Sequence, residues 1–576
     1  MTEQRLLSGQ DVPALQRGPT LSRRSMLRWA IAAVNSVATV SLLSACRGAE
    51  PTPLPTATVV AGESPVPTVQ APIPTEPLPT PTVAAGPKRG GRLVVAITSQ
   101  LQSLDPANHR DRVTETVLRC IFDGLVTRRP DGKIVPEIAE SWQQVNPTEW
   151  EFRIRPNIVF HNGEPLTAET VRFSLERVAF EGKLDGETSP RRSLLPPIVA
   201  IETDGDLRVR IKLANPVPEA ILLAGLVHNQ IVPKNYVESV GSVGLAERPI
   251  GAGPFAFVQG TVEGPIILRR FEQYYGGSPD MPPVGPPLLD EVVFRVVPEL
   301  SARLAALKAG EVHIAQGITP DALAQIENDP RIVVRSYPGT RTTWLAMNTT
   351  KAPFDRREVR QAMNYGLDVQ AIIDRVLGGR AVRMRGAVPP FSQHFDARIQ
   401  PYPFDPDRAK QLLAEAGLAN GFQLIIDAAE ADRSIVEIIA QQYRALGIDA
   451  SVRIWEWPVL REAALKGERQ MIFASWGNAF RHPVDLLNPT LMTGGRGNYA
   501  LYSNPEVDRL LEEAAVASET EAARLYARIQ QILYEDAPWV FLWIPDEIEA
   551  ASSLVEGWQP GPDGRVLLAD AWLASP

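Results

Sequence analysis

Three of the eleven tryptophans of this sequence lie in one stretch, residues 454–480, which reads IWEWPVLREAALKGERQMIFASWGNAF. The pattern predicts an amphipathic helix over residues 459–465, a glycine turn, and an apolar strand over residues 471–474 that continues into Trp476-Gly477-Asn478. A buried strand that ends in this way places an aromatic face and an accessible backbone at the edge of a cleft. The chemistry expected there is noncovalent binding of a solute. The alternative is that the tryptophans only fill the core.

The sequence offers no set of residues with the types and spacing that catalysis requires. Glu468 and Asp485 flank the tryptophan-rich stretch, but surface carboxylates at this density are nearly always solvated. No Ser, His and Asp set lies in a recognisable nucleophile motif, and the six histidines are scattered along the chain. We therefore expect neither an enzyme nor a bound metal or other cofactor.

Length and charge set limits on the architecture and on the partners. A chain of 576 residues is too long for one hydrophobic core, so two or more domains or lobes are expected. The composition, 44% hydrophobic and 22% charged, is that of an ordinary globular protein. A net charge of −9 gives no basic surface for nucleic acid, and we expect none to bind.

The N-terminal segment has the features of an export signal rather than of a folded element. Residues 1–45 combine a basic region, a short apolar run and small residues before Cys46. The paired Arg23-Arg24 resembles a twin-arginine signal, and LSAC resembles a lipobox, which implies cleavage before Cys46 and lipid on its sulfur. Residues 46–88 are rich in Pro and Thr and predict an extended, semi-rigid tether between that lipid and the body of the protein.

From Gly90 onward, strand and helix patterns alternate without a long gap, which favours an α/β architecture. Strands are predicted over residues 91–97, 149–154, 207–213, 255–258, 266–271 and 291–297. Helices are predicted over residues 113–122, 168–178, 302–309, 406–416, 434–446 and 519–535.

Several segments, in register along nearly all of this body, resemble the extracellular solute-binding proteins of the peptide and nickel class (family 5), the receptors that feed ABC importers. They include GGRLVVAI, IVPEIAESW, EWEFRIRPNIVFHNGEPLTAETVRFSLERV, ALKAGEVHIA, APFDRREVRQAMNYGLD and YSNPEVDRLLEEA. The resemblance implies a two-lobed periplasmic-binding-protein fold that closes on ligand about a hinge, with an extra subdomain inserted in lobe one. We expect lobe one to comprise residues 90–330 plus 545–576 and lobe two residues 331–544, with crossovers near residues 331–335 and 544–551.

The resemblance also assigns candidate ligand contacts in the tryptophan-rich stretch. Oligopeptide-binding relatives carry a Glu-Trp pair and, about nineteen residues later, Trp-x-x-Asp, whose aspartate holds the amino terminus of the peptide beside an arginine. Glu456-Trp457 and Trp476 keep this pattern, but Ala479 and Phe473 stand at the aspartate and arginine positions. A buried ammonium group without a carboxylate is not compensated for its desolvation, so this departure argues against the usual peptide clamp, although Asp427 or Asp485 could substitute.

The form Trp476-Gly477-Asn478-Ala479-Phe480 is closer to the nickel-chelate binders of the family, with Phe480 where those have Tyr. We expect Trp457 and Trp476 to stack on or wall the ligand, with Phe480 nearby. The side chain of Asn478 and the backbone at Gly477 are expected to supply hydrogen bonds.

Two further segments are expected to line the cleft. The strand RTTWLAMN follows the predicted crossover and contributes Arg341, Trp344 and Asn348, with Arg341 as a partner for a ligand carboxylate. His109 follows the first strand, and strand-end loops that face a crevice are the usual ligand sites of open α/β sheets. For Arg341 and His109 the alternatives are a surface arginine and a plain loop.

Taken together, the sequence predicts a monomeric, lipid-anchored receptor on the extracytoplasmic face of a bacterial cell membrane, working with ABC permease subunits. A di- or oligopeptide is the first candidate ligand, and a metal chelate, a sugar conjugate or another amphiphilic solute is the next. A sensory protein that uses the same fold without transport is the remaining alternative.

Overall fold

The computed structural model describes residues 87–281, 285–561 and 565–574. The chain divides into two units, residues 1–81 and 82–576, and all described residues belong to the second. The predicted export signal, Cys46 and residues 46–86 of the predicted tether lie outside the described residues. Among the helices that are described, none has both the length and the apolarity needed to cross a membrane.

One lobe is built on a mixed sheet whose strands follow one another in the order β16-β15-β17-β13-β18. β15 runs parallel to both β16 and β17, whereas β13 is antiparallel to β17 and to β18. The strands of this lobe-two sheet are β13 (Arg341–Met347), β15 (Gln423–Ala429), β16 (Asp449–Trp455), β17 (Met471–Gly477) and the first half of β18 (Trp539–Ser552), with β14 (Ala381–Arg383) added along β18.

The other lobe continues from β18 in the order β18-β11-β1-β10-β9-β8. Its first strand is rich in β-branched residues and lies parallel to both neighbours, β10 and β11. The strands of this lobe-one sheet are β1 (Arg92–Ile97), β8 (Phe255–Gln259), β9 (Ile266–Arg270), β10 (Glu291–Val296) and β11 (Ile314–Ala315).

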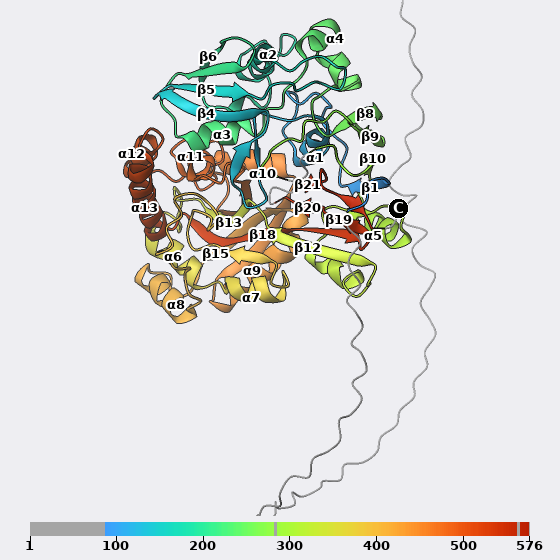
Figure 1. Cartoon of the computed structure of the whole chain (residues 1–576). Coiled ribbons are helices and arrows are strands. Elements are labelled where there is room, and N and C mark those ends of the chain that lie inside the picture. Colours follow the sequence, from blue (N-terminus) through green and yellow to red (C-terminus); the bar gives the residue numbers. More distant parts are fainter. Residues whose placement is uncertain (1–86, 282–284, 562–564, 575–576) are drawn as a thin grey trace, which may run out of the picture. The chain divides into compact units, whose positions relative to one another are not determined.

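The fourteen-residue strand β18 belongs to both lobes (Figure 1). Its residues 539–543 pair with β13, and residues 546–552 pair with β12 (Ile332–Pro338). Chain segments 338–341 and 545–546 therefore carry the backbone from one lobe to the other.

A four-stranded antiparallel sheet, ordered β4-β5-β7-β6, forms a subdomain with its own hydrophobic core. Its strands are β4 (Ala139–Asn146), β5 (Glu149–Ile154), β6 (Ile198–Thr203) and β7 (Arg208–Leu213), and α2 (Ala168–Ala179) and α3 (Glu219–Leu226) contribute buried side chains to that core. The remaining strands are short: β2 (Val126–Arg128), β3 (Ile134–Pro136), β19 (Val555–Glu556), β20 (Gln559–Pro560), β21 (Val566–Leu567) and β22 (Trp572–Leu573).

Helices cover both lobes, and sequence signals mark several of their ends. Asp111 accepts a hydrogen bond from the Thr114 amide at the start of α1, and Gly310, with φ of 75°, ends α5. The remaining α helices are α1 (Arg112–Ile121), α4 (Lys234–Glu247), α5 (Leu300–Ala309), α6 (Arg357–Tyr365), α7 (Val369–Arg375), α8 (Pro406–Glu415), α9 (Arg433–Ala445), α10 (Trp457–Leu465), α11 (Pro483–Leu491), α12 (Pro505–Ala514) and α13 (Glu519–Asp536).

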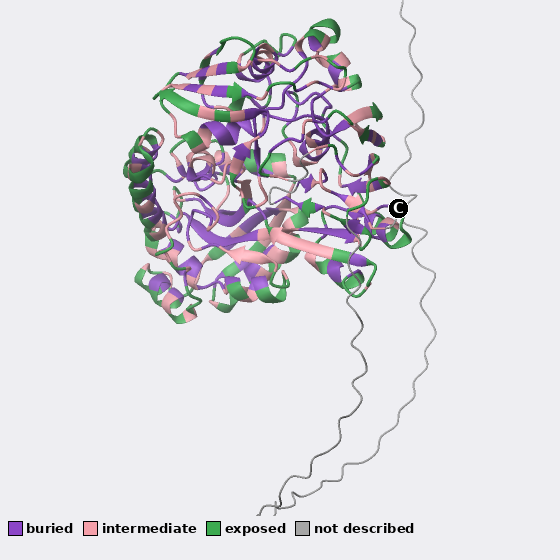
Figure 2. Cartoon of the chain, in the orientation of Figure 1, coloured by how far each residue is buried: buried purple, intermediate pink, exposed green. Residues whose placement is uncertain are grey.

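Both lobe sheets are covered on two faces, as their separate cores show. In lobe two, Trp344 and Ala346 pack in one core, whereas Leu345 and Met347 of the same strand pack in another. Figure 2 shows the central strands buried, whereas the outer helices α12 and α13 expose one side. The two-lobed α/β architecture predicted from the sequence is confirmed, and the predicted helices and strands agree with the observed bounds to within about two residues.

A buried ion pair joins the subdomain helix α2 to the loop after β1. Arg177 and Asp105 are almost fully buried, and the guanidinium binds both carboxylate oxygens, at 2.5 and 3.2 Å. Asp105 also accepts a hydrogen bond from the Ala107 amide, which fixes the loop. Removing one partner would leave an uncompensated charge in the interior.

We therefore expect Arg177→Ala to lower the free energy of unfolding by about 3–5 kcal/mol, measured by urea denaturation. The matched control is Arg172→Ala on the same helix, which removes half-exposed pairs with Glu169 and Glu176 and should cost about 0–1 kcal/mol. Equal losses in the two variants would contradict the role given to the buried pair.

Candidate functional site

Trp457 and Trp476 converge on one cavity at the end of the lobe-two sheet. Trp457 is the first residue of α10, Trp476 is the penultimate residue of β17, and both are half-buried. With Arg341 they line a cavity of about 420 Å³. The tryptophan-rich stretch thus presents two indole faces to open space. Trp455 instead packs against the core and donates a hydrogen bond to the buried Asp427, at 2.6 Å.

A second cavity, of about 480 Å³, lies between the lobes and shares Arg341 and Gly477 with the first. Lobe one contributes His109, Arg110 and Arg191, whereas lobe two contributes Arg341, Gly477 and Ala479. Arg341 and Gly477 face each other in the register of β13 and β17. The two cavities therefore form one cleft around these paired residues.

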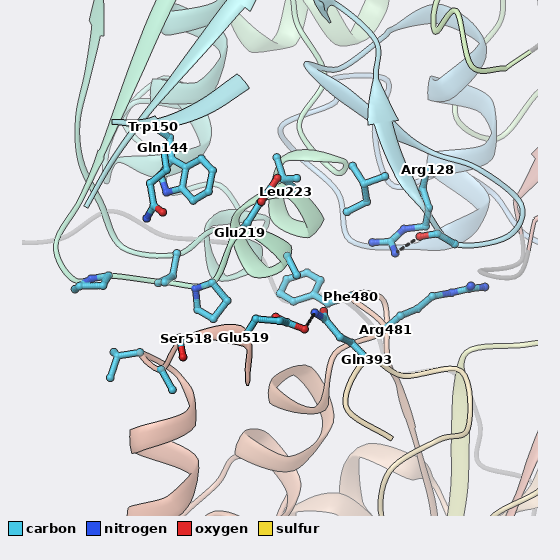
Figure 3. Close-up of a pocket in the computed structure, with 18 of the residues that line it drawn as sticks. Arg128, Gln144, Trp150, Glu219, Leu223, Gln393, Phe480, Arg481, Ser518 and Glu519 are labelled. Carbon is cyan, nitrogen blue, oxygen red and sulfur yellow. Dashed lines mark hydrogen bonds between the residues drawn. The ribbon is translucent and has the colours of Figure 1, made fainter. Parts of the chain in front are cut away.

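A larger cavity, of about 800 Å³, lies beside this cleft, between the four-stranded subdomain and lobe two (Figure 3). Phe480 and Arg481 line it from lobe two, and Trp150 lines it from the subdomain. The ring of Phe480 stacks on His228 at a centroid distance of 6.5 Å, and His228 lines the second cavity. Phe480 thus lies at the boundary between this cavity and the cleft rather than beside Trp476.

His109 is at the lobe-one wall of the cleft but is tied to its neighbours. It is 1% exposed, contacts Arg191, and lies 3.4 Å from Glu115. Burial and the nearby guanidinium of Arg191 lower the pKa of His109 to about 4, so its ring is neutral at pH 7.

Glu115 is the acid at the centre of this group. Burial by itself raises the pKa of its carboxyl, but the guanidinium groups of Arg191 and Arg119 outweigh burial and hold the pKa well below its ordinary value. The Glu115 carboxylate is therefore ionised, and the neighbouring guanidinium groups balance its charge within the wall of the cleft.

Three predicted contacts have no face toward the cleft in this structure, which corrects the expectation for Trp344, Asn348 and Asn478. Trp344 is 1% exposed and stacks on Trp539 at a centroid distance of 4.0 Å. Only Arg341, the first residue of β13, is exposed on that strand, because the sheet is covered on both faces.

The side-chain amides of Asn348 and Asn478 form hydrogen bonds with the backbone and with a neighbouring side chain. Asn348 donates to the carbonyl oxygens of Gly467 and Arg469, at 3.2 and 2.9 Å. Asn478 is fully buried and donates to the hydroxyl of Ser392, at 2.9 Å. These amides hold the loops at the two ends of β17 in place.

Asp427 and Asp485, the two acids considered as substitutes for an ammonium clamp, are also occupied. Asp427 is fully buried and binds Arg453 through two hydrogen bonds, at 2.6 and 3.0 Å. Asp485 accepts a hydrogen bond from the Phe480 amide at 3.2 Å, and burial raises its pKa to about 6. Ala479 itself lines the cleft, where its methyl group offers no charge.

The sequence analysis missed three arginines around the cleft: Arg110, Arg461 and Arg496. Arg496 lies over the ring of Trp476 at 4.5 Å, and Arg461 is on α10, four residues after Trp457. A signal was present for two of them, since Arg496 stands within Gly494-Gly495-Arg496-Gly497 and Arg110 directly follows His109. Within the described ranges, no three His, Cys, Asp or Glu side chains gather as a metal site would require.

The profile of the bacterial extracellular solute-binding proteins, family 5 middle region, matches residues 133–498. The chain is similar to heme-binding protein A of Haemophilus influenzae, with 30% identity over 77% of this chain and 85% of that protein. It is also similar to the glutathione-binding protein GsiB of Pectobacterium atrosepticum, with 27% identity over 83% of this chain and 93% of that protein.

Among solved structures, it is similar to the ABC transporter-associated periplasmic binding protein DppA from Helicobacter pylori in complex with the peptide STSA. The TM-score is 0.68 and the identity 28%, and the match covers 85% of this chain and 99% of that chain.

Proposed function

We propose a function from the family to which the chain belongs, the bacterial extracellular solute-binding proteins of family 5, which are substrate-binding receptors rather than enzymes. In this proposal the protein is a lipid-anchored receptor that binds a small organic solute between its lobes and delivers it to an ABC importer. The observation that carries the proposal is the cleft around Arg341 and Gly477. It has the indole faces of Trp457 and Trp476 on one side and lobe one on the other, and it lies where the backbone crosses between the lobes.

Closure of the lobes would occur about the crossing segments. Segments 338–341 and 545–546 are the hinge in this proposal, with lobe one before and after them in the chain and lobe two between them. Arg112 of lobe one binds both sides of the crossing, with Glu547 at 2.6 Å and the Thr340 hydroxyl at 3.2 Å. A bound solute would add contacts from both lobes and favour the closed form.

A di- or oligopeptide remains the first candidate ligand, supported by the peptide held by the Helicobacter pylori relative and by the glutathione named for another. A second candidate is a solute without an ammonium group, such as a metal chelate or another amphiphile. It is favoured by Ala479 and Phe473, which give the cleft neither charge of the peptide clamp that the resemblance implies.

The remaining parts of the proposal concern location and assembly. A lipid on Cys46 and the Pro/Thr-rich tether would keep a monomeric receptor at the outer face of the cell membrane, close to the permease subunits that accept its solute.

The experiment that tests binding in the cleft is native mass spectrometry of protein purified from its own cells, followed by a thermal-shift screen of peptides and chelates. We expect a retained small molecule, and we expect Trp476→Ala to lose it because the indole that walls the cleft is removed. The control is Trp142→Ala, a half-buried tryptophan of the subdomain, which should keep it. Retention of the solute by Trp476→Ala would refute the cleft assignment.

Ala479→Asp tests the choice between a peptide and a solute without an amine. If the peptide alignment is right, the new carboxylate should raise affinity for free-amino-terminus peptides by about tenfold or more, measured by calorimetry. N-acetylated peptides should gain nothing, and an absence of any gain would speak against the peptide candidate.

Cys46→Ser tests the anchor. We expect the wild-type chain to sediment with membranes and the variant to be released into the soluble fraction after export, because the acylated sulfur is lost. Cys120→Ser is the matched control, since Cys120 is buried in lobe one and should not affect anchoring. Continued membrane attachment of the Cys46 variant would rule out the lipid anchor.

A further inference from the structure

Four guanidinium groups surround the cleft without a carboxylate partner within 4 Å among the described residues: Arg110, Arg341, Arg461 and Arg496. Arg341 lines both cavities of the cleft, Arg110 lines one from lobe one, and Arg461 lines the other from α10. Arg496 lies over the ring of Trp476, which itself lines the cleft.

The polar contacts of these groups within the protein are few and uncharged. Arg341 donates to the Ser475 hydroxyl at 3.2 Å, and Arg110 donates to the Ser193 hydroxyl at 2.8 Å. Arg461 donates to the carbonyl oxygen of Arg496 at 3.4 Å and hydrogen-bonds Tyr499. Each guanidinium has five N–H donors, so most of its donors remain free for a ligand.

The acids nearby are too few to neutralise them, and most are committed elsewhere. Glu115 is held by Arg191 and Arg119, and Asp111 caps α1 through the Thr114 amide. Asp485, whose carboxyl group lies in the field of Arg110 and Arg496, accepts from the Phe480 amide. Asp432, which lines the first cavity, faces Arg341 without forming an ion pair with it.

Like charges therefore crowd one another in partly desolvated space. Burial, and then the charge of Arg496, lower the pKa of Arg110. Burial, and then the charge of Arg112, lower the pKa of Arg341. Arg112 and Glu547, which also act on Arg341, form an ion pair with each other and cancel. Asp432 and Asp485 against the four guanidinium groups then leave about two positive charges without a counter-charge, which a bound anion would supply.

Resting on the proposed function, we propose that the solute is a small organic acid with two anionic groups, carboxylate or phosphate. One anionic group binds Arg341 and Arg461 beside the two tryptophans, and the other binds Arg110 and Arg496 across the interface between the lobes. The part of the solute that joins them lies against the indoles of Trp457 and Trp476. Planar guanidinium groups suit either kind of oxyanion, and contacts to Arg110 make binding of the acid depend on lobe one as well as lobe two.

The test has two arms and uses the intact purified protein. The first arm identifies the solute that the protein retains, which should carry at least two negative charges at pH 7. The second arm titrates pyrophosphate and tricarballylate by calorimetry at low ionic strength, as the simplest phosphate and carboxylate probes. Binding of either probe is expected, and the stronger one indicates which oxyanion the cleft prefers.

Arg341→Gln and Arg496→Gln should each weaken probe binding about tenfold or more, because each removes a charged donor set from the anion. Arg524→Gln, an exposed residue of α13, makes the same change in net charge away from the cleft and should leave binding unchanged. Thermal unfolding of each variant should match the wild type, since none of the three side chains is buried in a core.

A retained solute that is neutral or cationic, binding of neither probe, or equal losses in the cleft and control variants would each overturn this inference. Those outcomes are distinct from failure of the proposed function itself, in which Trp476→Ala keeps the retained solute.

Discussion

Both lobes depend on one strand, β18, whose hydrogen bonds are divided between two sheets. Its first residues pair with β13 in lobe two, and its last residues pair with β12 and β11 in lobe one. At the crossing, the Gly339 amide donates to the carbonyl oxygen of Pro545 at 3.1 Å, and a Cβ at Gly339 would lie only 2.7 Å from that oxygen. Because Pro545 has no backbone N–H to donate, the ladder of hydrogen bonds along β18 is interrupted at the point where the chain passes from lobe to lobe.

The place of the cleft follows from this crossing. β13 begins immediately after it with Arg341, and the register of β13 with β17 sets Gly477 opposite Arg341 and Trp476 opposite Thr342. The backbone N–H of Asn478 donates to the carbonyl oxygen of Thr340, which fixes the end of β17 to the same segment. A change in the angle between the lobes would therefore move Arg110 of lobe one relative to Arg341 and Trp476 while leaving the geometry between the latter two intact.

Local patterns in the sequence were sufficient for the elements but not for the environment of single side chains. Alternation and capping residues predicted β1, α2, α5 and α13 because those signals act within one element. The placement of Trp344 depends on helices that cover both faces of its sheet, and the burial of Asn478 depends on Ser392, far away in the sequence. The arginine group was missed for the same reason, since Arg110, Arg341, Arg461 and Arg496 come from four separate segments that only the tertiary fold brings together.

The missing peptide clamp and the unpaired arginines are consistent with one charge balance. An ammonium ligand needs an acid that is free to pair with it. Glu115 binds Arg191 and Arg119, and Asp111 and Asp485 accept from the backbone amides of Thr114 and Phe480. Asp432, the remaining acid of the first cavity, lies in the field of Arg341. With Ala479 at the cleft surface and Phe473 packed against Trp543, neither charge of the family clamp is present to change that balance. A cationic group in the cleft would face uncompensated guanidinium groups as well as its own desolvation, whereas an anion would relieve the repulsion between Arg110 and Arg496. On the proposal of an acidic solute, the charge of the cleft would favour an acid over a free amine, independently of the shape that the tryptophans impose.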